Sequence, residues 1–219
     1  METTSYEFTL PENYTAFSPV SAEIFVQNTN RSFAVDTVFL KALQQSFARL
    51  YAAHDQDALY RTGVQWGNSV YAKIETLALT MHPDAKSIRE IPMPDFHRLF
   101  TNHLAALGWG NFELKRRDDF LFVDLYHSLW VEMLQSQSQA HGSKPHTSCA
   151  LYAGFFAGIF SRISNMPLAC IEITCKNEGY EHCSFLLDNE ETIAMVKARI
   201  SGKTTPLDAF EKVKKEFEG

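Results

Sequence analysis

The sequence PLACIEITCKNEGYEHCSFLL, residues 167–187, decides the fold of this chain, because it holds three of the four cysteines in a predicted hairpin. Residues Leu168–Thr174 and His182–Leu187 predict two strands, and the polar, glycine-containing segment between them predicts a turn. The fourth cysteine, Cys149, lies near the start of residues 147–164, whose apolar pattern predicts a helix. We therefore expect all four thiols to belong to one helix–hairpin unit.

Clustered thiols in a chain without a secretory signal favour metal ligands or a buried thiol set over disulfides. The first fourteen residues, METTSYEFTLPENY, lack the basic and apolar segments of a signal peptide, so we expect a cytoplasmic, reducing location. Glu172 supplies a further candidate donor. Three interpretations stay open at this point: a four-ligand zinc site, a reduced buried cluster, and a disulfide.

The spacing inside the hairpin sets a geometric condition on any metal site. Glu172 and Cys175 are an odd number of residues apart, so on an ideal strand they point to opposite faces of the sheet. They can share a metal only if the chain bends or bulges before Cys175. Cys170 lies on the same face as Glu172 and is a rival ligand.

Length and composition suit one globular domain. In a chain of 219 residues we expect an N-terminal arm over residues 1–33 and a single domain over residues 34–219. The formal net charge of −6 argues against nucleic acid as a partner, because nucleic-acid binding calls for a basic face. The longest apolar run, Ala150–Phe160, is too short to span a bilayer.

Capping residues and apolar spacing predict three helices in the first half of the chain. Asp36 is expected to cap the first, Asp55 or Asp57 to start the second, and Asp95 to cap the third, which Gly108 ends. These helices precede the first predicted strands.

The second half alternates strands and helices. Residues 112–115 and 120–125 predict a hairpin around a charged turn, and the polar residues 135–145 predict a loop. Asn189 and Pro206 are expected to start the last two helices. The element order predicts an α+β fold, with an antiparallel sheet flanked by helices.

The segment from Cys149 to Phe185 resembles the 4-vinyl-reductase-like domain. The resemblance covers residues 95–190 and is most specific over the core motif, residues 146–187. The matching motifs are the glycine-punctuated helix YAGFFAG (152–158), the Glu-x-x-Cys of residues 172–175, the turn NEGY (177–180) and the Cys-Ser-Phe of residues 183–185. The resemblance implies a fold shared with ligand-binding domains of nitric-oxide-sensing and Golgi-transport proteins, which encloses an apolar cavity and is often dimeric.

The resemblance also implies a zinc site. In the phenol-sensing members, zinc is held by a Cys before the helix, by the Glu and Cys of Glu-x-x-Cys, and by a Cys eight residues further on. These positions correspond here to Cys149, Glu172, Cys175 and Cys183. Three thiolates and one carboxylate suit tetrahedral zinc, and a site with four protein ligands is structural because no position is left for substrate.

The resemblance leads us to expect an apolar cavity beside the predicted helix 147–164. Two glycines inside this helix cost about 1 kcal/mol each relative to Ala, which indicates tight packing or a ligand against the backbone. The candidate ligand-binding residues come from this helix, the third helix and the region after the first hairpin: His97, Phe100, Tyr126, Trp130, Gly154 and Gly158. The glycines Gly63 and Gly67, within the second helix, are expected to serve packing.

The resemblance implies a non-enzymatic protein that binds a hydrophobic small molecule, such as a tetrapyrrole or chlorophyll precursor. Its role would be pigment handling or photosystem assembly, with a peripheral place at a photosynthetic membrane. Alternatives are an aromatic-effector sensor that acts through a protein partner, a vinyl-reductase-related enzyme, and an assembly scaffold without ligand. No nicotinamide or flavin motif is visible, which disfavours the enzyme. The arm, the acidic single domain and the family's habit predict a homodimer.

Overall fold

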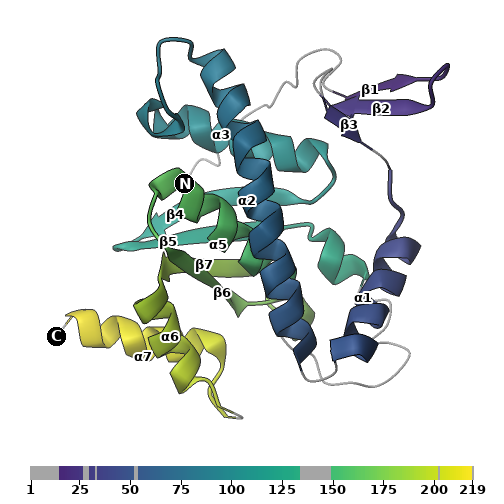
Figure 1. Cartoon of the computed structure of the whole chain (residues 1–219). Helices are drawn as coiled ribbons and strands as arrows, with labels where there is room; N and C mark the ends of the chain where they lie inside the picture. The colour runs from purple at the N-terminus through teal and green to yellow at the C-terminus, as the bar shows by residue number, and fades with distance from the viewer. Residues whose placement is uncertain are drawn as a thin grey trace.

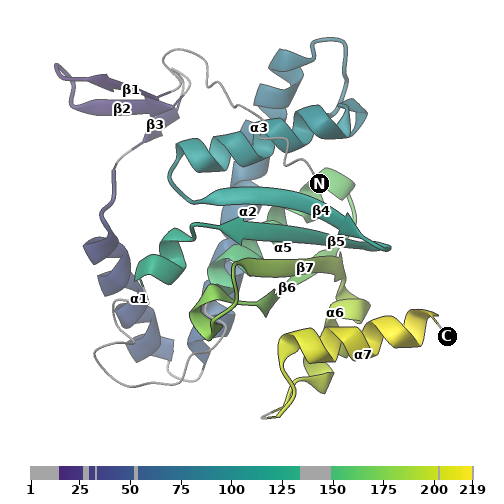
Figure 2. The ribbon, with the colours of Figure 1, turned by 180° about the vertical axis from the view of Figure 1, so that it is seen from behind.

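The computed structural model describes residues 15–26, 30–32, 34–51, 54–133, 149–201 and 203–218. The central element is a four-stranded antiparallel sheet with strand order β4-β5-β7-β6. The strands are β4 (Asn111–Arg117), β5 (Phe120–Tyr126), β6 (Leu168–Thr174) and β7 (Cys183–Asn189). Figure 2 shows them in this spatial order. The predicted α+β fold is confirmed.

Helices cover both faces of this sheet. One face packs on α2 (Asp55–Met81), α5 (Ala150–Ser164) and α3 (Met93–Ala106), and the other on α6 (Glu190–Arg199) and α7 (Pro206–Glu218). A short 3-10 helix, η2 (Ile88–Glu90), precedes α3, and another, η3 (Lys176–Glu178), lies in the β6–β7 turn.

Local capping explains where several helices begin. Asp36 accepts the backbone N–H of Phe39 at 2.7 Å ahead of α1 (Thr37–Tyr51), and Asn189 accepts that of Thr192 at 2.8 Å ahead of α6. Each such cap stabilises a helix by about 1 kcal/mol. Both predicted caps are confirmed.

The predicted start of α3 is wrong by two residues. The helix begins at Met93 after Pro92, whose fixed φ of −54° suits a helix entry. Asp95 therefore lies inside the first turn, where it receives a hydrogen bond from Arg98 at 2.8 Å and lies 3.3 Å from His82. Gly108, with φ of +78°, follows the end of the helix as predicted.

The helices α2 and α5 pack closely along glycines on both sides. A Cβ on Gly154 would lie 1.9 Å from the carbonyl oxygen of Tyr60, and one on Gly63 would lie 2.1 Å from that of Leu151. The same relation joins Gly158 and Gly67 to the opposite backbones. Side chains at these positions would clash, so the glycines permit the approach of the two helices. The predicted packing role of Gly63 and Gly67 is confirmed.

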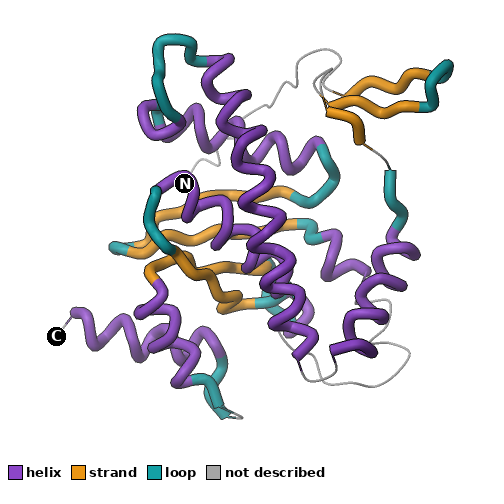
Figure 3. Tube along the Cα trace, in the orientation of Figure 1, coloured by secondary structure: helices purple, strands orange, loops and turns teal. Residues whose placement is uncertain are grey.

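The N-terminal segment is less integrated than the rest. Strands β1 (Thr15–Ser18), β2 (Glu23–Val26) and β3 (Asn30–Ser32) form a separate three-stranded sheet, away from the central one (Figures 1 and 3). The helix α1 has no buried residue. The first fourteen residues of the predicted arm and the predicted loop 135–145 lie outside the described residues.

Candidate metal centre

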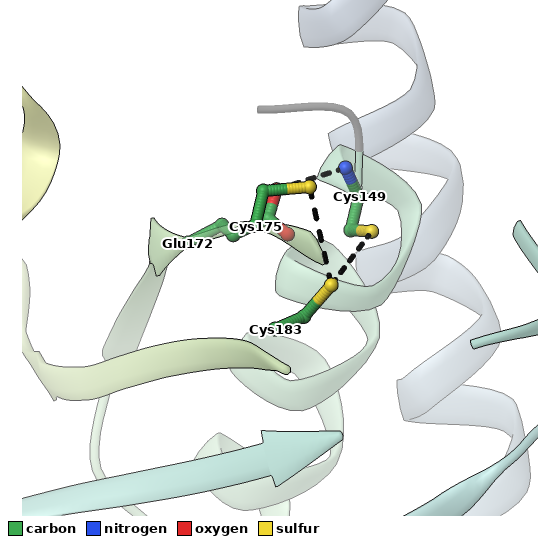
Figure 4. Close-up of side chains that lie close together, drawn as sticks. All are labelled: Cys149, Glu172, Cys175 and Cys183. Carbon is green, nitrogen blue, oxygen red and sulfur yellow. Dashed lines mark hydrogen bonds between the residues drawn. The ribbon is translucent and has the colours of Figure 1, made fainter. Parts of the chain in front are cut away.

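Four side chains from three elements converge at the N-terminal end of α5. Cys149 is the residue before α5, Glu172 lies on β6, Cys175 follows β6, and Cys183 is the first residue of β7. One donor atom from each lies within 4.8 Å of all the others, and all four residues are buried. Figure 4 shows them facing a common centre.

A bulge in β6 brings Glu172 and Cys175 to the same side. Glu172 pairs with Phe185, but Thr174 pairs with Ser184, so two residues of β6 oppose one step of β7. The extra residue turns the chain before Cys175. This irregularity meets the geometric condition that the odd spacing imposed.

The distances suit tetrahedral zinc. The Sγ atoms of Cys149 and Cys183 are 3.8 Å apart, and those of Cys183 and Cys175 are 3.9 Å apart. Zinc–sulfur bonds of about 2.3 Å at tetrahedral angles place two sulfurs roughly 3.8 Å apart. Glu172 Oε2 accepts the backbone N–H of Cys149 at 3.0 Å, which orients the carboxylate. The residues therefore fit zinc in both donor chemistry and spacing.

The electrostatics of the site also favour a cation. Burial raises the pKa of the Cys149 thiol well above its usual value, and burial does the same to the pKa of the Glu172 carboxyl. Charged groups in such a place require a compensating charge. Zinc would supply two positive charges and hold the thiolates ionised, while the N-terminal end of α5 favours negative charge beside it.

The structure separates the rival cysteine from this group. All four cysteines are free thiols, which disagrees with the disulfide alternative. Cys170 is buried but is not among the four donors that meet. Its backbone N–H donates to the Tyr60 hydroxyl at 3.3 Å, and burial raises the pKa of its thiol.

The candidate ligand residues do not surround one space. Gly154 and Gly158 face α2, and the room expected beside them is taken by the backbone of Tyr60 and Val64. This contact corrects the predicted cavity wall, because a glycine in a helix permits a helix neighbour as readily as a ligand.

His97 and Tyr126 have polar partners elsewhere. His97 Nε2 accepts the backbone N–H of Leu114 at 3.2 Å, on the edge strand β4 beside α3, and burial lowers the pKa of His97. Tyr126 follows Leu125, which is buried in the core, so Tyr126 points to the opposite face of the sheet. There its hydroxyl contacts Lys115 at 3.1 Å.

Phe100 and Trp130 lie in the aromatic core. The ring centroid of Phe100 is 5.4 Å from that of Phe160 and 6.4 Å from that of Phe155. Trp130 is 2% exposed, yet its indole N–H has no hydrogen-bond partner in the described structure. Of the six candidates, these two are the ones whose surroundings suit an apolar ligand.

A polar network on the far face of the sheet was not predicted. Asp124 is fully buried and receives hydrogen bonds from Ser184 at 2.6 Å and from Arg117, with Lys115 Nζ 3.0 Å away. Burial alone would raise the pKa of Asp124, but these contacts lower it below its usual value. The alternation Phe120, Phe122, Asp124 along one strand face was the available signal, because it puts a carboxylate in line with core residues.

Comparison with known proteins bears on the family. Residues 137–189 match the sequence model of the vinyl-4-reductase domain, which confirms the predicted resemblance. The phenol-responsive sensory domain of the transcription activator PoxR, crystallised with phenol, has a similar fold, with a TM-score of 0.62 and 16% identity. The match covers 82% of this chain and 87% of that domain.

Two further solved structures are more distant. A vinyl-4-reductase family protein from Methanocaldococcus jannaschii has a TM-score of 0.47 at 13% identity, over 72% of this chain and 83% of that chain. A trafficking protein particle complex subunit 3 from Naegleria fowleri, covalently bound to palmitic acid, has a TM-score of 0.39 at 10% identity, over 69% and 95%. No curated protein matches the sequence significantly. Among the described residues, no helix has both the length and the apolar character needed to cross a membrane.

Proposed function

We propose that this chain, whose residues 137–189 match the vinyl-4-reductase domain, is a non-enzymatic binding protein for a hydrophobic small molecule. Zinc is its structural cofactor, held by Cys149, Glu172, Cys175 and Cys183. The metal ties the start of α5 to the β6–β7 hairpin, and the ligand lies beside Trp130 in the aromatic core. The metal site has four protein ligands and therefore no role in turnover.

The observation that carries the binding role is the unpartnered indole N–H of Trp130 in the described structure. A buried donor without an acceptor costs about 1–3 kcal/mol, so native proteins seldom retain one. Trp130 belongs to the same buried cluster as Phe100 and Phe156. A ligand with an apolar body and one acceptor oxygen would satisfy the N–H and lie against aromatic rings.

Two ligand classes meet this description. The fold shared with a phenol-binding sensory domain supports a small aromatic alcohol, and the chain would then be a sensor that signals through a protein partner. A tetrapyrrole or chlorophyll precursor also combines an apolar ring with acceptor oxygens. That ligand would place the protein in pigment handling or photosystem assembly, in the cytoplasm beside a photosynthetic membrane.

A scaffold without ligand is the second candidate, and the packing around α5 favours it. Ten consecutive residues of this helix, Leu151–Phe160, are buried, and Gly154 and Gly158 lie against α2. Phenylalanine rings fill the other side, with the centroids of Phe155 and Phe156 5.6 Å apart. Under this alternative the core serves only to hold a surface for assembly.

The surface of α1 supports a homodimer. Val38, Phe39 and Leu50 are 71%, 58% and 78% exposed, and Leu43 is 42% exposed. Seven of the thirteen large hydrophobic side chains that are exposed in the described structure lie between Phe17 and Tyr51. Such a contiguous apolar surface indicates a protein interface. We propose that a second copy of the chain covers it.

Calorimetric titration with phenol and with protoporphyrin IX distinguishes the candidates. We expect one of the two to bind, and Trp130→Phe, which keeps the aromatic ring but removes the donor, to weaken binding about tenfold, since a hydrogen bond contributes roughly 1.4 kcal/mol. Trp109→Phe is the matched control and should bind as the wild type does. Absence of binding by both ligands at millimolar concentration, or equal affinity in Trp130→Phe, would favour the scaffold.

A further inference from the structure

Two buried carboxylates lie on opposite faces of the sheet near the start of β7. Glu172 is 5% exposed and belongs to the candidate metal site, whereas Asp124 is 0% exposed and lies on the other face. Asp124 pairs with Ser184 across the β5–β7 ladder, and its neighbour Leu125 pairs with Cys183. A fully buried carboxylate needs strong partners to persist, and those of Asp124 surround one metal ligand.

The residues on both sides of Cys183 engage Asp124. Ser184 donates its hydroxyl to Asp124 Oδ1 at 2.6 Å, and His182 Nε2 lies 3.5 Å from Asp124 Oδ2. Because neighbouring residues in a strand point to opposite faces, contacts of residues 182 and 184 on one face fix the direction of the Cys183 side chain on the other.

The same network reaches a second ligand. Thr174 donates its hydroxyl to the carbonyl of His182 at 3.2 Å, and Thr174 directly precedes Cys175. The backbone segments that carry Cys175 and Cys183 are thus joined behind the site. Lys115 and Arg117 hold Asp124 from the other side, with Lys115 Nζ at 3.0 Å.

We infer that Asp124 is a positioning residue for the metal site, acting through His182 and Ser184 on Cys183 and, through Thr174, on Cys175. This inference rests on the proposed zinc site and adds an outer support that none of the four ligands supplies. Groups that orient metal ligands from outside typically contribute about 10–100-fold to metal affinity. Asp124 differs from such groups in its location, since it acts through the sheet from the face opposite the metal.

Competition for Zn²⁺ with a chromophoric chelator tests the inference on the full chain. We expect Asp124→Asn to bind Zn²⁺ roughly 10–100-fold more weakly than the wild type, and Ser184→Ala, which removes a single hydrogen bond, to bind several-fold more weakly. Glu216→Gln is the control: it removes the exposed 2.7 Å ion pair with Arg199 on α6 and α7, far in sequence from the hairpin, and should stay within about twofold of the wild type.

The absorption spectrum of the Co²⁺-loaded protein separates positioning from general stability. Displaced thiolates shift the ligand-field bands of Co²⁺ in Asp124→Asn, whereas Glu216→Gln should keep the wild-type spectrum. Equal Zn²⁺ affinity and equal spectra in Asp124→Asn and wild type overturn the inference. If Asp124→Asn does not fold, Ser184→Ala decides by the same two readings. A wild-type protein that binds neither metal fails the proposed zinc site itself, which is a distinct result.

Discussion

The helices α5 and α1 are both 15 residues long, yet the protein uses them in opposite ways. Residues 151–160 of α5 are all buried, whereas α1 has no buried residue. α5 is fixed along one side by the α2 backbone, along the other by aromatic rings, and at its start by the candidate metal ligands. α1 is amphipathic but presents apolar side chains to solvent. The difference teaches that amphipathic spacing predicts a helix without predicting what covers it.

The largest expected effect comes from adding one carbon to α5. In Gly158→Ala the new Cβ would lie 2.3 Å from the carbonyl oxygen of Val64, so α2 and α5 must separate. We expect the free energy of unfolding in urea to fall by about 3 kcal/mol. Leucine at this position should prevent folding rather than fill a cavity.

The matched change in α1 gives the contrast. Ala42→Leu enlarges the side chain at an exposed position and should alter the unfolding free energy by less than about 0.5 kcal/mol. A Gly158→Ala protein as stable as the wild type would show that the helices are not held in this contact.

An effect of similar order is expected at the start of α5. Cys175→Ser should lose the metal and, with it, about 4 kcal/mol, the stabilisation given by a ligand present at roughly a thousand times its dissociation constant. Cys170→Ser is the matched control, because this buried thiol lies outside the four-donor group and its loss should leave the metal bound. Thermal unfolding with and without chelator measures both. Retention of metal by Cys175→Ser and its loss from Cys170→Ser would reverse the assignment of ligands.

The smallest effect on the fold, but a visible one on assembly, is expected in α1. Leu43→Glu places a charge in the exposed apolar surface and should convert a dimer to a monomer at micromolar concentration, as measured by light scattering. Gln45→Glu adds the same charge at another position of the helix and should stay dimeric. A monomeric wild-type protein would mean that α1 has a different partner.

Local signals in the sequence predicted much of the fold. Asp36 and Asn189 were read as caps because a cap depends on residues three positions apart. The hairpin spacing required a bulge before Cys175, and the bulge is present. The four donors were predicted by resemblance, and the structure brings them together.

Features that depend on distant packing were beyond the sequence. Gly154 and Gly158 signalled close approach, but the identity of the neighbour depends on α2, far earlier in the chain. The start of α3 was misread because Pro92 competed with Asp95 for the cap position. Tyr126 was assigned to the cavity although strand alternation after Leu125 indicated the other face, and the network around Asp124 was missed for the same reason.

The central claim is that a metal ion joins α5 to the hairpin, and a zinc count with X-ray absorption tests it most directly. Protein purified under reducing conditions should carry about one zinc per chain, with three sulfur neighbours at about 2.3 Å and one oxygen neighbour at about 2.0–2.2 Å. Those neighbours would be Cys149, Cys175, Cys183 and Glu172. Zinc-free protein whose thermal unfolding is unchanged by added Zn²⁺ or by chelator would contradict the claim, and the four side chains would then be a buried thiol cluster without metal.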